Sequence, residues 1–282
     1  MDLPGIDRFH LLAVQLGEES EVVERVVERL HLLDPGSIAV LPELVAWTDE
    51  QSETALAALV EIARQHGLGI ITTLNLPPEL CEDLPGRDPD ARYNAVVIVT
   101  RHGALHVPQA KTTPRSFETS RALGGPNIGV AAYRRINRVR LDLGPGVVEA
   151  RFLVSTDLWA LAQLGPRALR SDLFVVPAGF PHGAEETARR LLELSRAGGV
   201  ARATILVNAS GPSPDPARAG EAIAVEELVE HEGPVPVEWP DPAVIRAAFS
   251  LGHPVAAGHI AVPRALAEAP LTVGEYPITI TL

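Results

Sequence analysis

The sequence predicts an α/β protein in which helices cover β-sheets made of hydrophobic strands. Two observations carry this prediction. The spacing of apolar residues alternates along the chain between the period of a helix and that of a strand. The strand segments are also apolar at nearly every position, which is typical of strands buried on both faces. The 282-residue length is ample for one such domain with a large core.

The first half of the chain alternates strands with helices. Residues 18–33 place valines and a leucine on one helical face, which predicts an amphipathic helix. A second helix is expected over residues 50–66, with Gly67 as its C-terminal cap. The last two strands of this half form a hairpin across the turn "RHG". The expected strands are residues 11–16, 37–43, 68–76, 93–100 and 104–110.

The second half repeats the theme. Residues 147–157 form one long strand or two short ones, and residues 158–170 form two short helical pieces broken at Gly165-Pro166. A longer helix is expected over residues 185–203. In "YRRINRVR" (133–140), alternation predicts a strand with one cationic, solvated face. The other expected strands are residues 172–179, 204–211, 259–263 and 278–282.

Composition limits the function classes. A net charge of −12 argues against a general nucleic-acid surface, which needs clustered cations. No apolar run is long enough to span a membrane, and the first residues do not resemble a signal peptide, so we expect a cytoplasmic protein. Cys81 is the single cysteine, which precludes an intrachain disulfide, and neighbouring carboxylates disfavour its thiolate. The nine histidines show no paired metal spacing, so no metal or organic cofactor is expected.

Three strand ends carry polar residues that could do chemistry. Glu43 follows a buried strand and Pro42, and a half-buried carboxylate there is a usable base. Lys111 is the only lysine in a chain that otherwise uses 23 arginines. A compact ammonium differs from the broad guanidinium fork, so a single lysine in this background is either a candidate for chemistry or a chance survivor of compositional drift, and its surroundings must decide. Ser155 ends a third apolar strand.

Each of these residues also has a structural interpretation. Glu43 could be a helix-start or surface glutamate. Ser155 and Thr156 could cap a helix that begins at Leu158. Taken one at a time, these structural interpretations are the stronger ones for Glu43 and Ser155.

The order of the segments changes that balance. The pieces "AVQL", "VLPEL", "YNAVVIVTRHGAL", "QAK", "STDLW", "LFVVPAGFP" and "ARATILVNASG" follow one another as in the nitrilase (carbon–nitrogen hydrolase) superfamily. The chain resembles that superfamily from about residue 10 to 211 and again from "GHIAVP" onward. The resemblance implies a four-layer α-β-β-α sandwich, and hydrolysis of a small amide, carbamoyl compound or nitrile without a metal. It also implies homodimers or larger assemblies.

The resemblance also assigns roles to residues. Glu43 matches the general base, Lys111 the catalytic lysine and, more loosely, Glu118 a second glutamate that orients the pair. The N–H of Thr156 would join Lys111 in stabilising the negative charge of a tetrahedral intermediate. The resemblance further implies that Trp159 and Phe180 lie next to the bound substrate.

The decisive departure is at position 155, where serine stands in place of the superfamily's cysteine nucleophile. A serine hydroxyl is much harder to deprotonate, and the expected loss is several powers of ten in rate, on the order of 4 kcal/mol of barrier. Three explanations remain open. The serine was introduced by mutation, or the chain is a natural homologue with a binding or assembly role, or Lys111 acts as base for a serine nucleophile.

A second departure follows "NASG". About forty residues intervene before "GHIAVP", where the superfamily continues directly. We expect a single domain over residues 1–282 with an irregular insertion at about 212–250, which carries one helix over residues 241–250. The insertion shapes a substrate mouth or an interface, or is a tolerated surface excursion.

Overall fold

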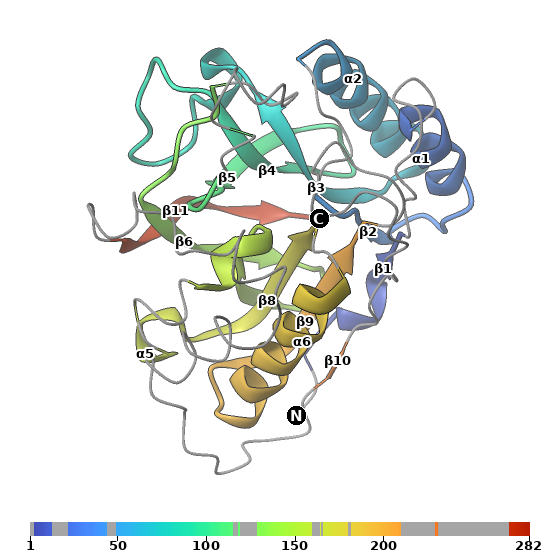
Figure 1. Cartoon of the computed structure of the whole chain (residues 1–282). Coiled ribbons are helices and arrows are strands. Elements are labelled where there is room, and N and C mark those ends of the chain that lie inside the picture. Colours follow the sequence, from blue (N-terminus) through green and yellow to red (C-terminus); the bar gives the residue numbers. More distant parts are fainter. Residues whose placement is uncertain are drawn as a thin grey trace.

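The computed structural model describes residues 3–12, 22–43, 49–114, 118, 129–159, 164, 166–179, 182–209, 229–230 and 271–282. These residues form two β-sheets with helices outside them (Figure 1). Within this part of the chain, no helix has the length and apolar character needed to cross a membrane.

The first sheet has the strand order β1-β2-β3-β4-β5. Its first three strands are parallel, and β4 and β5 are added as an antiparallel hairpin, as the sequence predicts. Helices α1 (Val22–Leu30) and α2 (Asp49–His66) pack on its outer face. The strands are β1 (Phe9–Leu11), β2 (Ile38–Val40), β3 (Gly69–Leu76), β4 (Tyr93–Val99) and β5 (Leu105–Ala110).

The second sheet has the order β10-β9-β8-β7-β6-β11. Strands β7, β8 and β9 are parallel, and β6 joins β7 antiparallel. Helix α6 (His182–Ala197) covers this sheet, and the short α5 (Pro166–Leu169) precedes β8. The strands are β6 (Arg135–Asp142), β7 (Val147–Phe152), β8 (Ser171–Ala178), β9 (Ala201–Asn208), β10 (Val229–Glu230) and β11 (Thr272–Thr281).

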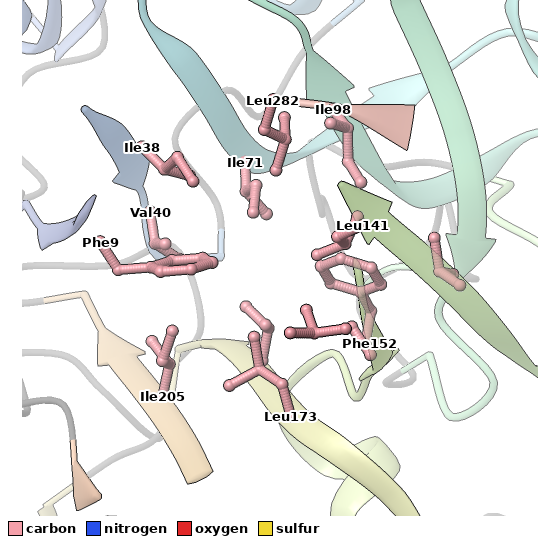
Figure 2. Close-up of a cluster of buried hydrophobic side chains, with 14 of the residues drawn as sticks. Phe9, Ile38, Val40, Ile71, Ile98, Leu141, Phe152, Leu173, Ile205 and Leu282 are labelled. Carbon is pink, nitrogen blue, oxygen red and sulfur yellow. The ribbon is translucent and has the colours of Figure 1, made fainter. Parts of the chain in front are cut away.

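Three separate apolar clusters define four layers. One lies between the first sheet and α1 and α2, and another lies between the second sheet and α6. The third joins the two sheets, with Phe9 and Ile71 on one side facing Phe152 and Leu173 on the other (Figure 2). The central strands of this core, such as β3 and β8, are buried at nearly every position because they are covered on both faces, and the predicted α-β-β-α sandwich is confirmed.

Several predicted boundaries shift. The first strand is Phe9–Leu11 rather than residues 11–16, and residues 13–20 lie outside the described part. The helix predicted over residues 185–203 ends earlier in the structure, at Ala197. Gly199 turns the chain in the left-handed region with φ +66°, and β9 starts at Ala201. The long segment 147–157 is one strand followed by a 3₁₀ turn, η5 (Ser155–Trp159).

Other predictions meet the structure in part. The cationic strand is confirmed as β6, where Arg138 and the exposed Arg140 alternate with buried Val139 and Leu141. The final strand is longer than predicted and begins at Thr272. The predicted strand 259–263, the helix 241–250 and almost all of the insertion lie outside the described residues.

Candidate active site

The sheets bring the candidate residues together from distant segments. Glu43 follows β2, and its N–H donates to the carbonyl of Ala178, the last residue of β8 in the other sheet, at 3.2 Å. Lys111 follows β5, and its N–H donates to the carbonyl of Asn94 in β4 at 2.8 Å. These main-chain hydrogen bonds fix both side chains at one end of the sandwich.

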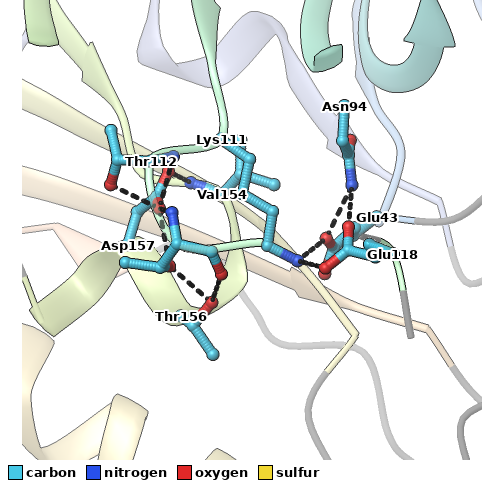
Figure 3. A network of polar contacts seen from close by, with 9 residues as sticks. Glu43, Asn94, Lys111, Thr112, Glu118, Val154, Thr156 and Asp157 are labelled. Atoms are coloured by element: carbon cyan, nitrogen blue, oxygen red, sulfur yellow. Dashed lines mark hydrogen bonds and ion pairs between the residues drawn. The ribbon is translucent and has the colours of Figure 1, made fainter. Parts of the chain in front are cut away.

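A buried ammonium lies between two carboxylates. Nζ of Lys111 donates to Oε1 of Glu43 at 2.5 Å and to Oε2 of Glu118 at 2.9 Å (Figure 3). The three side chains are at most 1% exposed. The interpretation of Glu43 as a surface or helix-start glutamate is therefore wrong. Breaking such a buried pair leaves an uncompensated charge, which typically costs about 3–5 kcal/mol.

Asn94 is a member of this cluster that the sequence analysis missed. Its Nδ2 donates to Oε1 of Glu43 at 3.0 Å and to Oε1 of Glu118 at 2.9 Å. The amide and the ammonium thus bridge the same two carboxylates, the amide from above and the ammonium from the left in the view of Figure 3. The available signal was a single amide side chain inside the apolar run of β4, where a buried polar group needs a partner.

Ser155 begins a strained turn that follows β7 after Leu153 and Val154. Its φ is +50°, the only positive φ of a non-glycine residue among the described residues. The side chain is fully buried, and Oγ has no hydrogen-bond partner within the described part of the chain. A helix-capping role for the Ser155 hydroxyl is therefore wrong. Strained backbone of this kind persists only where the surroundings hold it, and it gathers at functional sites.

The Ser155 turn lies against the segment that follows Lys111. The hydroxyl of Thr156 donates to the carbonyl of Thr113 at 2.9 Å. Asp157, fully buried, accepts hydrogen bonds from Thr112 and Thr113 (Figure 3). Burial raises the pKa of the Asp157 carboxyl to about 6, while the hydrogen bonds from both threonines and the nearby Lys111 charge oppose that rise.

The side chains of two expected substrate-side residues, Trp159 and Phe180, lie outside the described part of the structure. The backbone of Trp159 closes the 3₁₀ turn that begins at Ser155, and nothing is described of its side chain. Phe180 lies outside the described residues. Cys81 ends the short helix η3 (Pro78–Cys81), where burial, more than its acidic neighbours, raises the pKa of its thiol to about 12.

No protein-family model and no curated protein matches this chain. Solved structures do share its fold. A CN-hydrolase superfamily protein from Xanthomonas campestris superposes with a TM-score of 0.56 at 15% identity, covering 87% of this chain and 93% of that chain. The chain has the nitrilase-superfamily fold. A carbon–nitrogen hydrolase from Helicobacter pylori superposes with a TM-score of 0.54 at 15% identity, covering 80% of this chain and 82% of that one.

A third structure with this fold is a cysteine-to-serine mutant of a nitrilase-superfamily amidase from Nesterenkonia. It superposes with a TM-score of 0.53 at 16% identity, over 79% of this chain and 83% of that chain. These superpositions therefore confirm the predicted fold. At these identities the likeness carries no activity over to the present chain.

Proposed function

We propose that this chain has a carbon–nitrogen hydrolase site for a small amide, carbamoyl compound or nitrile, impaired by the serine at position 155. The observation that carries the proposal is the buried Glu43–Lys111–Glu118 cluster beside the strained Ser155 turn. A buried ammonium held by two carboxylates is expensive to maintain for stability alone, since a hydrophobic replacement is often as stable.

The residue types suit each step of the reaction. A nucleophile at position 155 attacks the substrate carbon, and Glu43 takes the nucleophile's proton. The negative charge that develops on the substrate oxygen or nitrogen is stabilised by Lys111 and by the N–H of Thr156, in the first turn of a helix where N–H groups lack helical partners. With an amide or carbamoyl compound, Glu43 then gives the proton to the departing ammonia or amine, and water hydrolyses the acyl intermediate to the acid. With a nitrile, one further water must first add to the covalent imidate before ammonia departs.

Serine at position 155 makes the first step slow. Glu43 is engaged by Lys111 and Asn94, and Ser155 Oγ accepts or donates no hydrogen bond within the described residues. The Ser155 hydroxyl is thus buried without a base in hydrogen-bonding contact among the residues that the structure describes. This observation also favours the second candidate, a non-catalytic homologue that keeps the pocket to bind a ligand or a partner subunit.

The structures with the same fold favour the small-amide class. The Nesterenkonia amidase, in variants altered at its active site, forms complexes with acrylamide and butyramide. We extend this substrate class to the present chain. The proposal includes a single domain, a cytoplasmic location, a homodimer or larger homo-oligomer, and no nucleic-acid partner. No metal or organic cofactor enters any step.

Restoring the thiol separates the candidates. We would compare the protein as given with Ser155→Cys in a Cys81→Ala background and measure ammonia release from short aliphatic amides, carbamoyl compounds and nitriles. The proposal predicts release by the Ser155→Cys protein at least a thousandfold faster than by the serine form. Ser155→Ala is the matched control without a nucleophile. Silence of the thiol form across the panel would favour the binding role.

A further inference from the structure

Asp157 is a buried carboxylate that the proposed reaction does not use. Both of its oxygens accept hydrogen bonds, and Oδ1 lies within reach of four donors. Oδ1 lies 2.9 and 3.0 Å from the main-chain N–H groups of Thr112 and Thr113, and 2.7 and 2.8 Å from their hydroxyls. Oδ2 accepts from the N–H of Val154 at 3.2 Å. With five donors around it and no exposed surface, the Asp157 carboxylate has no room to act as a base on substrate.

The hydrogen-bond donors to Asp157 come from the two segments that carry Lys111 and Ser155. Thr112 and Thr113 directly follow Lys111, and Val154 directly precedes Ser155. The Asp157 N–H also donates to the Val154 carbonyl at 3.0 Å. Asp157 therefore closes the turn around Ser155 with two reciprocal hydrogen bonds to one residue, while its other oxygen holds the chain just after Lys111.

This arrangement accounts for the strained backbone. A non-glycine residue with φ +50° costs about 1–2 kcal/mol in the left-handed region, so the surrounding contacts must enforce it. The contacts that span Ser155 are those between Asp157 and Val154. The hydroxyl of Thr156, bonded to the Thr113 carbonyl, fastens the same turn to the Lys111 segment from a second point.

We propose that Asp157 is a positioning residue that sets the Lys111 ammonium and the position-155 nucleophile in register with each other. It acts through the backbone of both segments and touches neither reacting group. The inference rests on the proposed function for its purpose, but its physical content is the placement of two groups.

Substitution by asparagine tests the need for a carboxylate. An amide in this place must turn its NH₂ toward the Val154 N–H or toward the two threonine N–H groups, so at least one donor meets another donor. The change in size is negligible. A loss in Asp157→Asn therefore reports lost acceptors rather than a cavity.

The measurement is the chemistry of a thiol at position 155, which needs no turnover. In full-length Cys81→Ala/Ser155→Cys protein we would record the thiolate absorbance and the iodoacetamide alkylation rate from pH 6 to 10. With Asp157 replaced by Asn, we expect the alkylation rate to fall at least tenfold and the thiol titration to shift by at least half a pH unit. Asp172→Asn is the matched control, because Asp172 also accepts a main-chain N–H, from Glu149 at 3.0 Å, away from the site. It should change the rate less than twofold.

An Asp157→Asn protein that melts cooperatively, with thiol titration and rate unchanged within twofold, overturns the proposal. Thr113→Val provides the second test if Asp157→Asn does not fold. It removes one hydroxyl donor and keeps the main-chain N–H, and we expect a threefold or greater fall in rate, with an unchanged rate again overturning the proposal. Thiol chemistry that depends on Asp157 in a protein that hydrolyses no amide would sink the proposed function and leave the positioning role standing.

Discussion

Two carboxylates share one amide and one ammonium in the interior of this protein. Glu43 and Glu118 each accept hydrogen bonds from both Asn94 and Lys111. Oε1 of Glu43 accepts both of its bonds, whereas Glu118 accepts one on each oxygen. Sequence patterns pointed to Lys111 because arginine was used everywhere else. The one signal for Asn94 was an amide inside an apolar strand, and it did not identify the partners, which lie 51 and 24 residues away along the chain.

The Asn94 amide should contribute measurably to stability. Asn94→Leu removes one hydrogen bond to each of the two buried carboxylates, and hydrogen bonds to charged groups are worth about 1.5–3 kcal/mol each. We expect the free energy of unfolding to fall by about 3 kcal/mol in urea titrations. Thr72→Val on neighbouring β3 is the control, because the buried Thr72 hydroxyl has no partner among the described residues. Equal effects of the two substitutions would contradict a special role for Asn94.

At the scale of elements, the strands were predictable and their ends were not. A buried strand such as β8 can be recognised from its unbroken apolar run "LFVVPA". The helix before β9 was predicted too long because its end depends on Gly199, and the alanines and arginines beyond it suit a helix as well as a strand. The turn at Ser155 was unpredictable for a similar reason, since tertiary contacts rather than propensity hold its left-handed backbone.

The backbone strain at Ser155 predicts that the difference in stability between a glycine and an alanine variant has opposite signs at Ser155 and Ser171. Ser155 has φ +50°, so Ser155→Gly should be more stable than Ser155→Ala by about 1 kcal/mol. Ser171 begins β8 with ordinary strand backbone, and there glycine should be less stable than alanine by about 0.5–1 kcal/mol. Thermal and urea unfolding of the four variants would measure both differences. The same sign at both positions would refute backbone strain at Ser155.

For the whole molecule, the four-layer architecture follows from counting faces. The central strands of each sheet are apolar on both sides, so they must be covered by helices outside and by the other sheet inside, while β6 and β11 at one edge of the second sheet keep one face polar. This reasoning needs no exact boundaries, so helices covering buried sheets could be predicted from the sequence pattern, whereas the four layers were implied by the resemblance to the nitrilase superfamily. The insertion at 212–250 resisted the same reasoning, because its prolines, glycines and glutamates carry no periodic apolar face.

The layered core also governs thiol reactivity. Cys81 is fully buried in the first cluster, and burial raises the pKa of its thiol to about 12. A raised pKa keeps the thiol protonated, so at pH 8 the reactive thiolate is scarce. The native protein should therefore react with a thiol reagent such as dithionitrobenzoate more than a hundredfold more slowly than the chain in guanidinium chloride. Rapid native labelling at pH 8 would show that the first layer opens or is misplaced.

The most direct test of the account replaces the one lysine by the residue the chain otherwise prefers. In the Cys81→Ala/Ser155→Cys protein, we would measure ammonia release after Lys111→Arg and, as the matched control, after Arg101→Lys in the exposed β4–β5 turn. A guanidinium is too broad for the space between Glu43 and Glu118. We predict that Lys111→Arg lowers kcat/KM at least a hundredfold while Arg101→Lys leaves it within twofold. Hydrolysis that survives Lys111→Arg within tenfold would contradict the account.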